Sequence, residues 1–240
     1  MKLEIVNHCW RYSRLLRYQL SSLLLHPPQE VDVVYTLFYS TEDVATSEVV
    51  AWFDQQSTTN VRWNWRELST PQLLRRAIGR NLAAQATAAD WVWFTDADHS
   101  FGSGCLDALP EQLSQVAGPL AFPRHLYIHI EHRLGDLLID AASGPLQLLD
   151  VGARSDFKRR RNNRAIGGIQ ITRGDVCRAN GYCAKHRRLQ RPIEGKVFAN
   201  CYGDRVFRRG LGTPGEPIDV PNLFRIRHSE RGEDSPGLEL

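Results

Sequence analysis

Strand and helix patterns alternate along the first hundred residues, and this alternation constrains the fold more than any other feature of the 240-residue sequence. Residues 3–6 and 31–39 are rich in β-branched and aromatic side chains, as buried strands are. Amphipathic helix patterns follow them at residues 12–25 and 46–55. Parallel strands need a crossover helix between them, so this order predicts an α/β fold with one mixed, mostly parallel sheet and helices on both faces.

A third round of the pattern ends in two acidic residues. A short strand is predicted at residues 60–65, and a helix at residues 69–89 opens on Ser69-Thr70-Pro71. The apolar run at residues 91–95 then predicts a buried strand that leads directly into Asp96-Ala97-Asp98. Ligands bind at the carboxyl ends of strands in such sheets, so this turn is the first candidate for a functional site.

The second half of the chain is less regular. A polar stretch at residues 141–164 contains the basic run 158–164 and predicts a loop or lid. The remaining predicted elements are a helix at 105–116, strands at 120–130 and 165–172, and a turn with a short helix at 174–182. No repeat or linker divides the chain, so we expect one domain over residues 1–240. Within it we expect a nucleotide-binding half (1–100), a sugar- and acceptor-binding half (101–230) and a flexible tail (231–240).

Composition narrows the class of protein. With 42% hydrophobic and 24% charged residues the chain is typical of globular proteins, and no apolar stretch approaches the ~20 residues of a membrane-spanning helix. The charged residues among the first thirty leave no secretory signal, so we expect a cytoplasmic protein without an integral membrane segment. The five cysteines lack CxxC spacing and predict buried free thiols.

Asp96 and Asp98 are spaced so that both carboxylates can reach one ion. Mg²⁺ and Mn²⁺ bound to a nucleotide diphosphate take one or two protein carboxylates together with phosphate oxygens. A turn or a helix cap after a strand uses the same residue types. The two carboxylates alone therefore leave a metal site and a structural turn open.

Two longer segments carry a resemblance. One runs from Arg80-Asn81-Leu82-Ala83 through the apolar strand to Asp96-Ala97-Asp98, and the other joins Gly167-Gly168-Ile169-Gln170-Ile171 to Asn180-Gly181-Tyr182. In order and spacing they resemble the family 2-type glycosyltransferases with the GT-A fold, the second segment being similar also to its galactosyltransferase-like branch. The resemblance implies a GT-A fold and a metal-dependent enzyme that moves a sugar from a nucleoside-diphosphate sugar, foremost a UDP-sugar, to an acceptor hydroxyl.

The resemblance also implies roles for individual residues. The predicted donor-binding residues are Arg80, Asp96, Asp98 and Gly168, and the predicted ligands of Mn²⁺ or Mg²⁺ are Asp96, Asp98 and the late His228. The family's late acidic pair has only a partial counterpart in Gly203-Asp204-Arg205, which makes Asp204 the expected general base of an inverting reaction. The basic segment 158–164 is the expected lid over the donor phosphates, with an ordinary surface loop as the alternative. The acceptor is left open as a glycan, a lipid-linked sugar or a protein.

Two other functions compete with this one. A phosphohydrolase with a DxD nucleophile is disfavoured because Asp98 is followed by His99-Ser100 and lies far from the N-terminus. A GT-A-like module that binds nucleotides or anions without turnover is favoured by the arginine clusters and by the incomplete acidic motif. Nucleic acid is not expected as a partner.

Three patterns are interpreted as structural. Residues 210–215 spell GxGxxG but are followed by Glu216-Pro217, so they predict a loop and no dinucleotide site. His125 and His129 alternate with apolar residues, which predicts the polar face of a strand and disfavours a zinc site with His132. The six tryptophans are expected mainly in the core.

Overall fold

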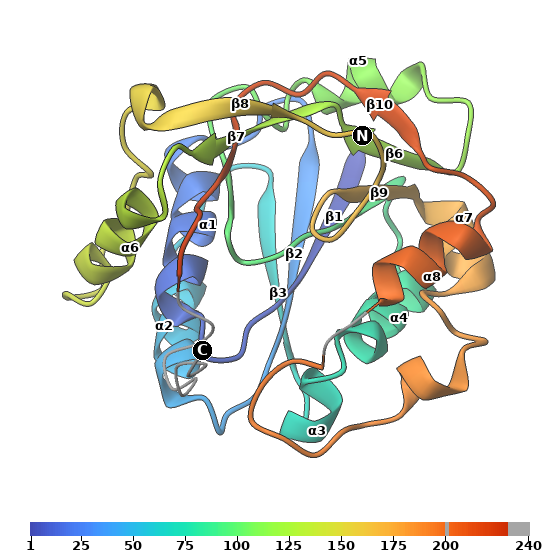
Figure 1. The fold of residues 1–240 in the computed structure, drawn as a ribbon, viewed down its shortest axis with the longest axis horizontal. Coiled ribbons are helices and arrows are strands. Elements are labelled where there is room, and N and C mark those ends of the chain that lie inside the picture. The colour runs from blue at the N-terminus through green and yellow to red at the C-terminus, as the bar shows by residue number, and fades with distance from the viewer. Residues whose placement is uncertain (200–201, 230–240) are drawn as a thin grey trace.

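The computed structural model describes residues 1–199 and 202–229, and a seven-stranded sheet is its largest element (Figure 1). Its strand order is β10-β6-β9-β4-β1-β2-β3. The strands are β1 (Lys2–His8), β2 (Asp32–Tyr39), β3 (Val61–Glu67), β4 (Trp91–Phe94), β6 (Leu120–Pro123), β9 (Gln170–Arg173) and β10 (Glu216–Ile218). Only β9 runs antiparallel to its neighbours in this sheet, β4 and β6. The prediction of a mixed, mostly parallel sheet is confirmed.

Helices cover both faces of this sheet, as expected (Figure 1). One face packs against α1 (Ser13–Leu25), α2 (Val44–Asp54) and α5 (Leu109–Ser114), and the other against α3 (Thr70–Leu73), α4 (Arg76–Ala86), α7 (Gly174–Asn180) and α8 (Gly203–Gly210). Because side chains alternate along a strand, Leu3 and Ile5 of β1 enter the first core and Val6 enters the second. This sandwich holds β1 and β4 rigidly at the centre of the sheet.

Several predicted boundaries were wrong. The single helix expected at 69–89 is two helices, α3 and α4, which break at Leu74 and Arg75. The strand expected at 120–130 is β6 and β7 (His125–His129), separated at Arg124, and α5 is shorter than the helix expected at 105–116. The regular spacing of apolar residues does not indicate where such breaks occur, because the breaks depend on the residues that each turn packs against.

A second, four-stranded sheet has the order β5-β11-β7-β8 and was not predicted. It comprises β5 (His99–Phe101), β11 (Leu223–Arg225), β7 and β8 (Phe157–Arg161), and α6 (His132–Ala141) and the 3₁₀ turn η1 (Arg154–Asp156) lie in its connections. β8 corrects the prediction of a loop over 141–164, since its five residues pair antiparallel with β7. Phe157 is buried and stacks on His129 at 4.0 Å, which anchors the strand although its other four residues are exposed.

The patterns interpreted as structural are mostly confirmed. β10 follows the GxGxxG segment, so no helix opens there. His129 corrects one expectation, because it is buried and does not lie on a polar face. Cys9, Cys105 and Cys177 are buried and Cys183 is half-buried, while Cys201 and the predicted tail at 231–240 lie outside the described residues. Among the residues described, no helix combines the length and the apolar character that crossing a membrane requires.

Candidate functional site

The turn that carries Asp96 and Asp98 follows β4, whose four residues are all buried. Gln19 of α1 fixes the backbone of this turn, because its side-chain amide donates to the carbonyl oxygens of Asp96 (2.9 Å) and His99 (3.0 Å). The side-chain oxygen of Gln19, Oε1, in turn accepts hydrogen bonds from the Asn7 amide (2.7 Å) and the Tyr35 hydroxyl. A buried amide with this many partners holds the turn in one conformation.

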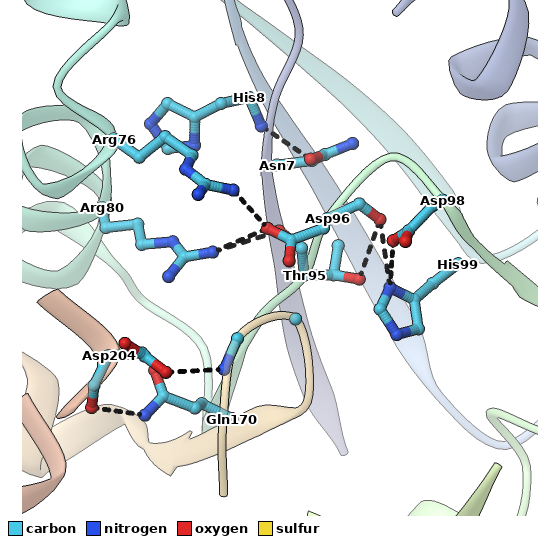
Figure 2. Close-up of polar contacts among 12 residues, drawn as sticks. Asn7, His8, Arg76, Arg80, Thr95, Asp96, Asp98, His99, Gln170 and Asp204 are labelled. Carbon is cyan, nitrogen blue, oxygen red and sulfur yellow. Dashed lines mark hydrogen bonds and ion pairs between the residues drawn. The ribbon is translucent and has the colours of Figure 1, made fainter. Parts of the chain in front are cut away.

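Asp96 is bound by two guanidinium groups from the first two turns of α4 (Figure 2). Its Oδ1 lies 3.0 Å from Arg76 Nη1 and 3.1 Å from Arg80 Nη2. Burial raises the pKa of Asp96, but the charges of Arg76 and Arg80 outweigh it, so that the pKa lies below its ordinary value. Asp96 is therefore ionised at neutral pH, with its charge compensated.

Asp98 is bound from the opposite side. Its Oδ2 accepts from Arg225 Nε at 2.7 Å, and its Oδ1 lies 3.0 Å from His99 Nδ1. Burial raises the pKa of Asp98, yet His99 and Arg225 bring it well below the ordinary range, while Asp98 raises the pKa of Arg225. The backbone N–H of Ile226 also donates to the Asp98 carbonyl oxygen (2.8 Å), so this aspartate joins β11 to the end of β4.

A cavity of about 310 Å³ opens in front of the two carboxylates. Besides Asp96 and Asp98, its polar lining consists of Arg76, Arg225 and two histidines, His8 and His228, with Tyr12 at its edge. Arg76 and Arg225 are partly exposed there, so their remaining N–H groups are available to an anionic ligand. Guanidinium groups bind phosphate oxygens in this way, so the cavity can accept an anion such as a diphosphate.

The carboxylate and imidazole groups that line this cavity could ligate a divalent ion. No group of three or more His, Cys, Asp or Glu side chains able to hold a metal exists in the part of the chain that the structure describes. His228 Nδ1 is nevertheless buried without a hydrogen-bond partner, Asp98 Oδ1 is buried against the His99 imidazole (3.0 Å), and both Asp98 and His228 line the cavity. One carboxylate and one imidazole, completed by phosphate oxygens and water, suit Mn²⁺ or Mg²⁺. Asp96, the third predicted ligand, binds Arg76 and Arg80 through Oδ1, and its role as a metal ligand stays a prediction.

Asp204 lies in the first turn of α8, beside the glycine loop that packs on the carboxylate turn. Its Oδ2 accepts from the Gly167 N–H (3.1 Å), and a Cβ added to Gly167 would lie 3.6 Å from Asp96 Oδ2. Gly168 is closer still, because a Cβ there would lie 2.7 Å from the Asp96 backbone nitrogen and 2.8 Å from the His99 ring. Gly168 thus permits the contact between loop and turn, and its predicted part in donor binding stays a prediction.

A chain of hydrogen bonds runs from Arg80, which binds Asp96, to the first turn of α8 at Asp204. Arg80 Nη1 donates to the Tyr182 hydroxyl (3.0 Å), which donates to Gln170 Oε1 (3.1 Å). Gln170 Nε2 then donates to the Asp204 carbonyl oxygen (3.1 Å), as Figure 2 shows. Burial raises the pKa of Tyr182, so its hydroxyl remains a neutral donor. Since Arg80 also binds Asp96, these contacts connect Asp96 to Asp204.

Sequence reasoning missed Arg76, Arg225 and Gln19. Arg76 lies one helical turn before Arg80, so the i, i+4 spacing was a usable signal. Arg225 belongs to a three-residue strand and Gln19 to a leucine-rich helix, and neither pattern distinguishes them from surface residues.

The comparisons with known proteins concern the fold. No protein-family model and no curated protein matches this sequence. Among solved structures, the 1-349 fragment of S. aureus TarS in complex with UDP-GlcNAc has a TM-score of 0.55 at 11% identity, over 98% of this chain and 62% of that one. The chain has a GT-A-like fold. That prediction is confirmed, whereas membership of family 2 in particular stays a prediction.

Two further structures agree on this fold. A second TarS structure has a TM-score of 0.54 at 13% identity, over 94% of this chain and 36% of that one. Mannosyltransferase PcManGT from Pyrobaculum calidifontis, in complex with GDP-Man and Mn²⁺, has a TM-score of 0.50 at 12% identity, over 93% of this chain and 56% of that one. This chain therefore spans less than two thirds of the structures that it resembles, and these identities bear on the fold alone.

Proposed function

We propose that this chain is a glycosyltransferase of the cytoplasm that moves a sugar from a nucleoside-diphosphate sugar to an acceptor hydroxyl. One observation carries the proposal: two ionised carboxylates at the end of a central strand share a cavity with Arg76, Arg225 and His228. The GT-A-like structures in complex with UDP-GlcNAc or with GDP-Man and Mn²⁺ support a nucleotide sugar as the ligand of this cavity.

In this reaction the bond between the anomeric carbon and the diphosphate oxygen breaks, and the electron pair leaves with the nucleoside diphosphate. Arg76 and Arg225 stabilise the charge that builds on the leaving group, because their N–H groups are already fixed by Asp96 and Asp98. A divalent ion held by Asp98 and His228 would supply Lewis-acid stabilisation of the same charge.

Asp204 serves the acceptor side. The acceptor oxygen forms the new bond to the anomeric carbon, and its proton passes to the Asp204 carboxylate, in an inverting displacement. The Gly167 N–H and the Gln170 side chain hold Asp204 in place at the start of α8. A base fixed in this way keeps its carboxylate directed at one position, which favours the proton transfer.

A paired experiment tests these roles. Thermal unfolding is followed with UDP- and GDP-sugars, with and without Mn²⁺, and the best donor is then assayed for hydrolysis and for transfer. Asp98→Asn is expected to abolish the Mn²⁺-dependent rise in Tm, since a ligand stabilises only the state that binds it. Asp204→Asn is expected to leave that rise intact and to lower turnover by about 10² to 10⁴.

The matched control is Asp219→Asn, because Asp219 pairs with Arg124 at 3.5 Å on the surface and does not line the cavity. This variant is expected to behave as the unmodified protein in both assays. Donor binding without turnover would make the chain a binding module. Cleavage of phosphate monoesters in place of nucleotide sugars would make it a phosphohydrolase. Either result contradicts the proposal.

A further inference from the structure

The edge strand β8 carries a row of cationic side chains. Lys158, Arg159, Arg160 and Arg161 are all exposed, and β8 pairs only with β7. Side chains on one face of a strand repeat every ~7 Å, so each face of β8 presents two positive charges at that spacing. Arg159 Nη2 also lies 2.8 Å from His125 Nδ1, and the pKa of His125 is lowered by burial and by this guanidinium.

A second cationic group lies at α8. Arg205 and Arg209 are exposed on this helix, Arg164 is exposed on the segment after β8, and Arg208 donates to the Ala165 carbonyl oxygen at 2.7 Å. Burial lowers the pKa of Arg208, and the nearby charge of Arg164 lowers it further. The four guanidinium groups thus lie close enough to repel one another.

The chain joins the two groups through residues 162–164, and together we call them the cationic surface, with Lys158 and Arg160 on one face of β8 and Arg159 and Arg161 on the other. It consists of Lys158, Arg159, Arg160, Arg161, Arg164, Arg205, Arg208 and Arg209. Residues 162–166 connect β8 to the loop at Gly167 and Gly168, and Arg208 lies one helical turn after Asp204. The cationic surface therefore begins beside the proposed base and extends away along β8.

The protein compensates its charges only in part, since the charge of Asp204 raises the pKa of Arg208. Within residues 1–199 and 202–229, no carboxylate forms an ion pair with any side chain of the cationic surface. Unpaired like charges in one place destabilise a fold by mutual repulsion. The arrangement is costly unless an anionic ligand binds it.

Structural roles account for parts of this surface. Charged residues on β8 protect an open sheet edge from pairing with other chains, and Arg208 and Arg209 complement the dipole at the end of α8. Neither role explains Arg164 or Arg205. Nor does either role explain why Arg164 and the cationic residues of α8 lie beside Asp204.

We propose that the cationic surface binds the acceptor and that the acceptor is an anionic glycan, a linear chain whose units carry carboxylate or phosphate. The proposal rests on the glycosyltransferase function proposed above and names the substrate class of the same site. Arginines hold the acidic groups of successive units by charge-assisted hydrogen bonds, and the hydroxyl to be glycosylated lies at Asp204. The regular spacing along β8 suits a repeating polymer.

Two other polyanions fit this surface less well. Proteins that bind single-stranded nucleic acid interleave several exposed aromatic rings with the cations, but Phe157 of β8 is buried and Tyr202, which precedes α8, is a single exposed ring beside the cationic surface. A membrane surface requires an exposed apolar face beside the charges, whereas the exposed residues of β8 are all cationic and Ile166, exposed near Arg164, is a single apolar side chain. The observations therefore favour a glycan.

The test compares two triple variants with the same change in charge. Arg164→Gln/Arg205→Gln/Arg209→Gln removes exposed guanidinium groups near Asp204, and Arg187→Gln/Arg188→Gln/Arg191→Gln removes three exposed ones at the 3₁₀ helix η2 (Arg187–Gln190). Binding of oligogalacturonate, neutral dextran, a short single-stranded RNA and phosphatidylglycerol vesicles is measured by titration. The donor-induced rise in Tm is recorded for each variant, so that loss of the fold or of the donor site is separated from loss of glycan binding.

We expect the unmodified protein to bind oligogalacturonate but not dextran, and binding to weaken steeply between about 50 and about 200 mM NaCl. The first variant is expected to weaken this binding about tenfold, and the η2 variant to leave it unchanged. Equal losses in both variants, equal binding of dextran, or tighter binding of RNA or vesicles would overturn the proposal. Glycan binding without any donor turnover would instead contradict the glycosyltransferase function and leave the surface assignment intact.

Discussion

His8 ends β1 at the edge of the donor cavity and has both ring nitrogens buried without a hydrogen-bond partner. Its ring stacks on Phe38 at 5.0 Å and approaches α4 so closely that a Cβ on Gly79 would lie 2.2 Å from Nε2. Burial, with Arg80 and Arg76 nearby, lowers the pKa of His8 well below its ordinary value. The imidazole is therefore neutral in the folded protein.

This neutral histidine predicts a loss of stability in acid. Below about pH 6.5 the unfolded chain binds a proton that folded His8 refuses, so the free energy of unfolding falls by up to about 1.4 kcal/mol per pH unit. His8→Phe keeps the stacking and removes the titration, so the fall in the free energy of unfolding between pH 7.5 and 5.5, measured by urea unfolding, is expected to become smaller by about 1.4 kcal/mol in total. His132→Gln, at an exposed position, is the control, and an unchanged slope in His8→Phe would contradict the assignment.

The acidic residues of the site were predictable, but their partners were only partly so. A strongly apolar strand that ends in Asp96-Ala97-Asp98 places both carboxylates at the edge of the sheet, whatever the rest of the chain does. Of their cationic partners only Arg80 was predicted. Arg225 reaches Asp98 across 127 positions of sequence, and no local pattern encodes a contact of that range.

At the scale of elements, the break between α3 and α4 positions the site. Because α4 begins at Arg76, the N-terminal end of this helix lies at Asp96, and its dipole favours the carboxylate and an incoming diphosphate alike. The sequence predicted helical residues there but not the break. The break depends on contacts of α3 and of its neighbour Leu74 with distant segments, such as the hydrogen bonds that Pro71 and Leu74 accept from Ile193 and Ala199.

The glycine loop before β9 yields a second prediction. In Gly168→Ala the new methyl group would meet the Asp96 backbone at 2.7 Å and the His99 ring at 2.8 Å, so the loop and the carboxylate turn must separate. We expect about 1–3 kcal/mol of destabilisation in urea unfolding and a reduced donor-induced rise in Tm. Gly144→Ala is the matched control, because the nearest atom there is 3.8 Å away. Equal behaviour of the two variants would show that the loop does not press on the turn.

At the scale of the whole molecule, the two sheets meet at the turn that carries Asp96 and Asp98. β5 follows Asp98 directly and pairs with β11, whose Arg225 returns to the Asp98 carboxylate. β5 and β11 have three residues each and lie far apart in the sequence, so neither the second sheet nor its link to the first was predictable from local patterns. The N-terminal part of the larger sheet was predictable because a helix pattern follows each of the parallel strands β1, β2 and β3, whereas the three-residue parallel strand β10 was not predicted.

The segment at residues 191–199 has no helix or strand and borders the same cavity. Phe198 lines the cavity, and the guanidinium carbon of Arg76 lies over the Phe198 ring, 5.2 Å from the ring centre. In the same segment, the Lys196 carbonyl oxygen accepts a hydrogen bond from Trp10 Nε1 (2.7 Å). A donor that fills the cavity therefore adds contacts to this segment. No residue of β8 lines this cavity, although the sequence predicts a lid, or alternatively an ordinary surface loop, at residues 158–164.

Limited proteolysis distinguishes the two segments. Trypsin is expected to cut first after Lys196, next to the exposed Val197, and only later within β8, whose pairing with β7 must open before cleavage. A UDP- or GDP-sugar with Mn²⁺ is expected to slow the cut after Lys196, because binding lowers the population of the open segment. Mass spectrometry of the fragments identifies each cut, and Lys196→Gln removes the first one as a control. Earlier cleavage in β8, or a rate after Lys196 that the donor leaves unchanged, would show that residues 191–199 do not close on the donor.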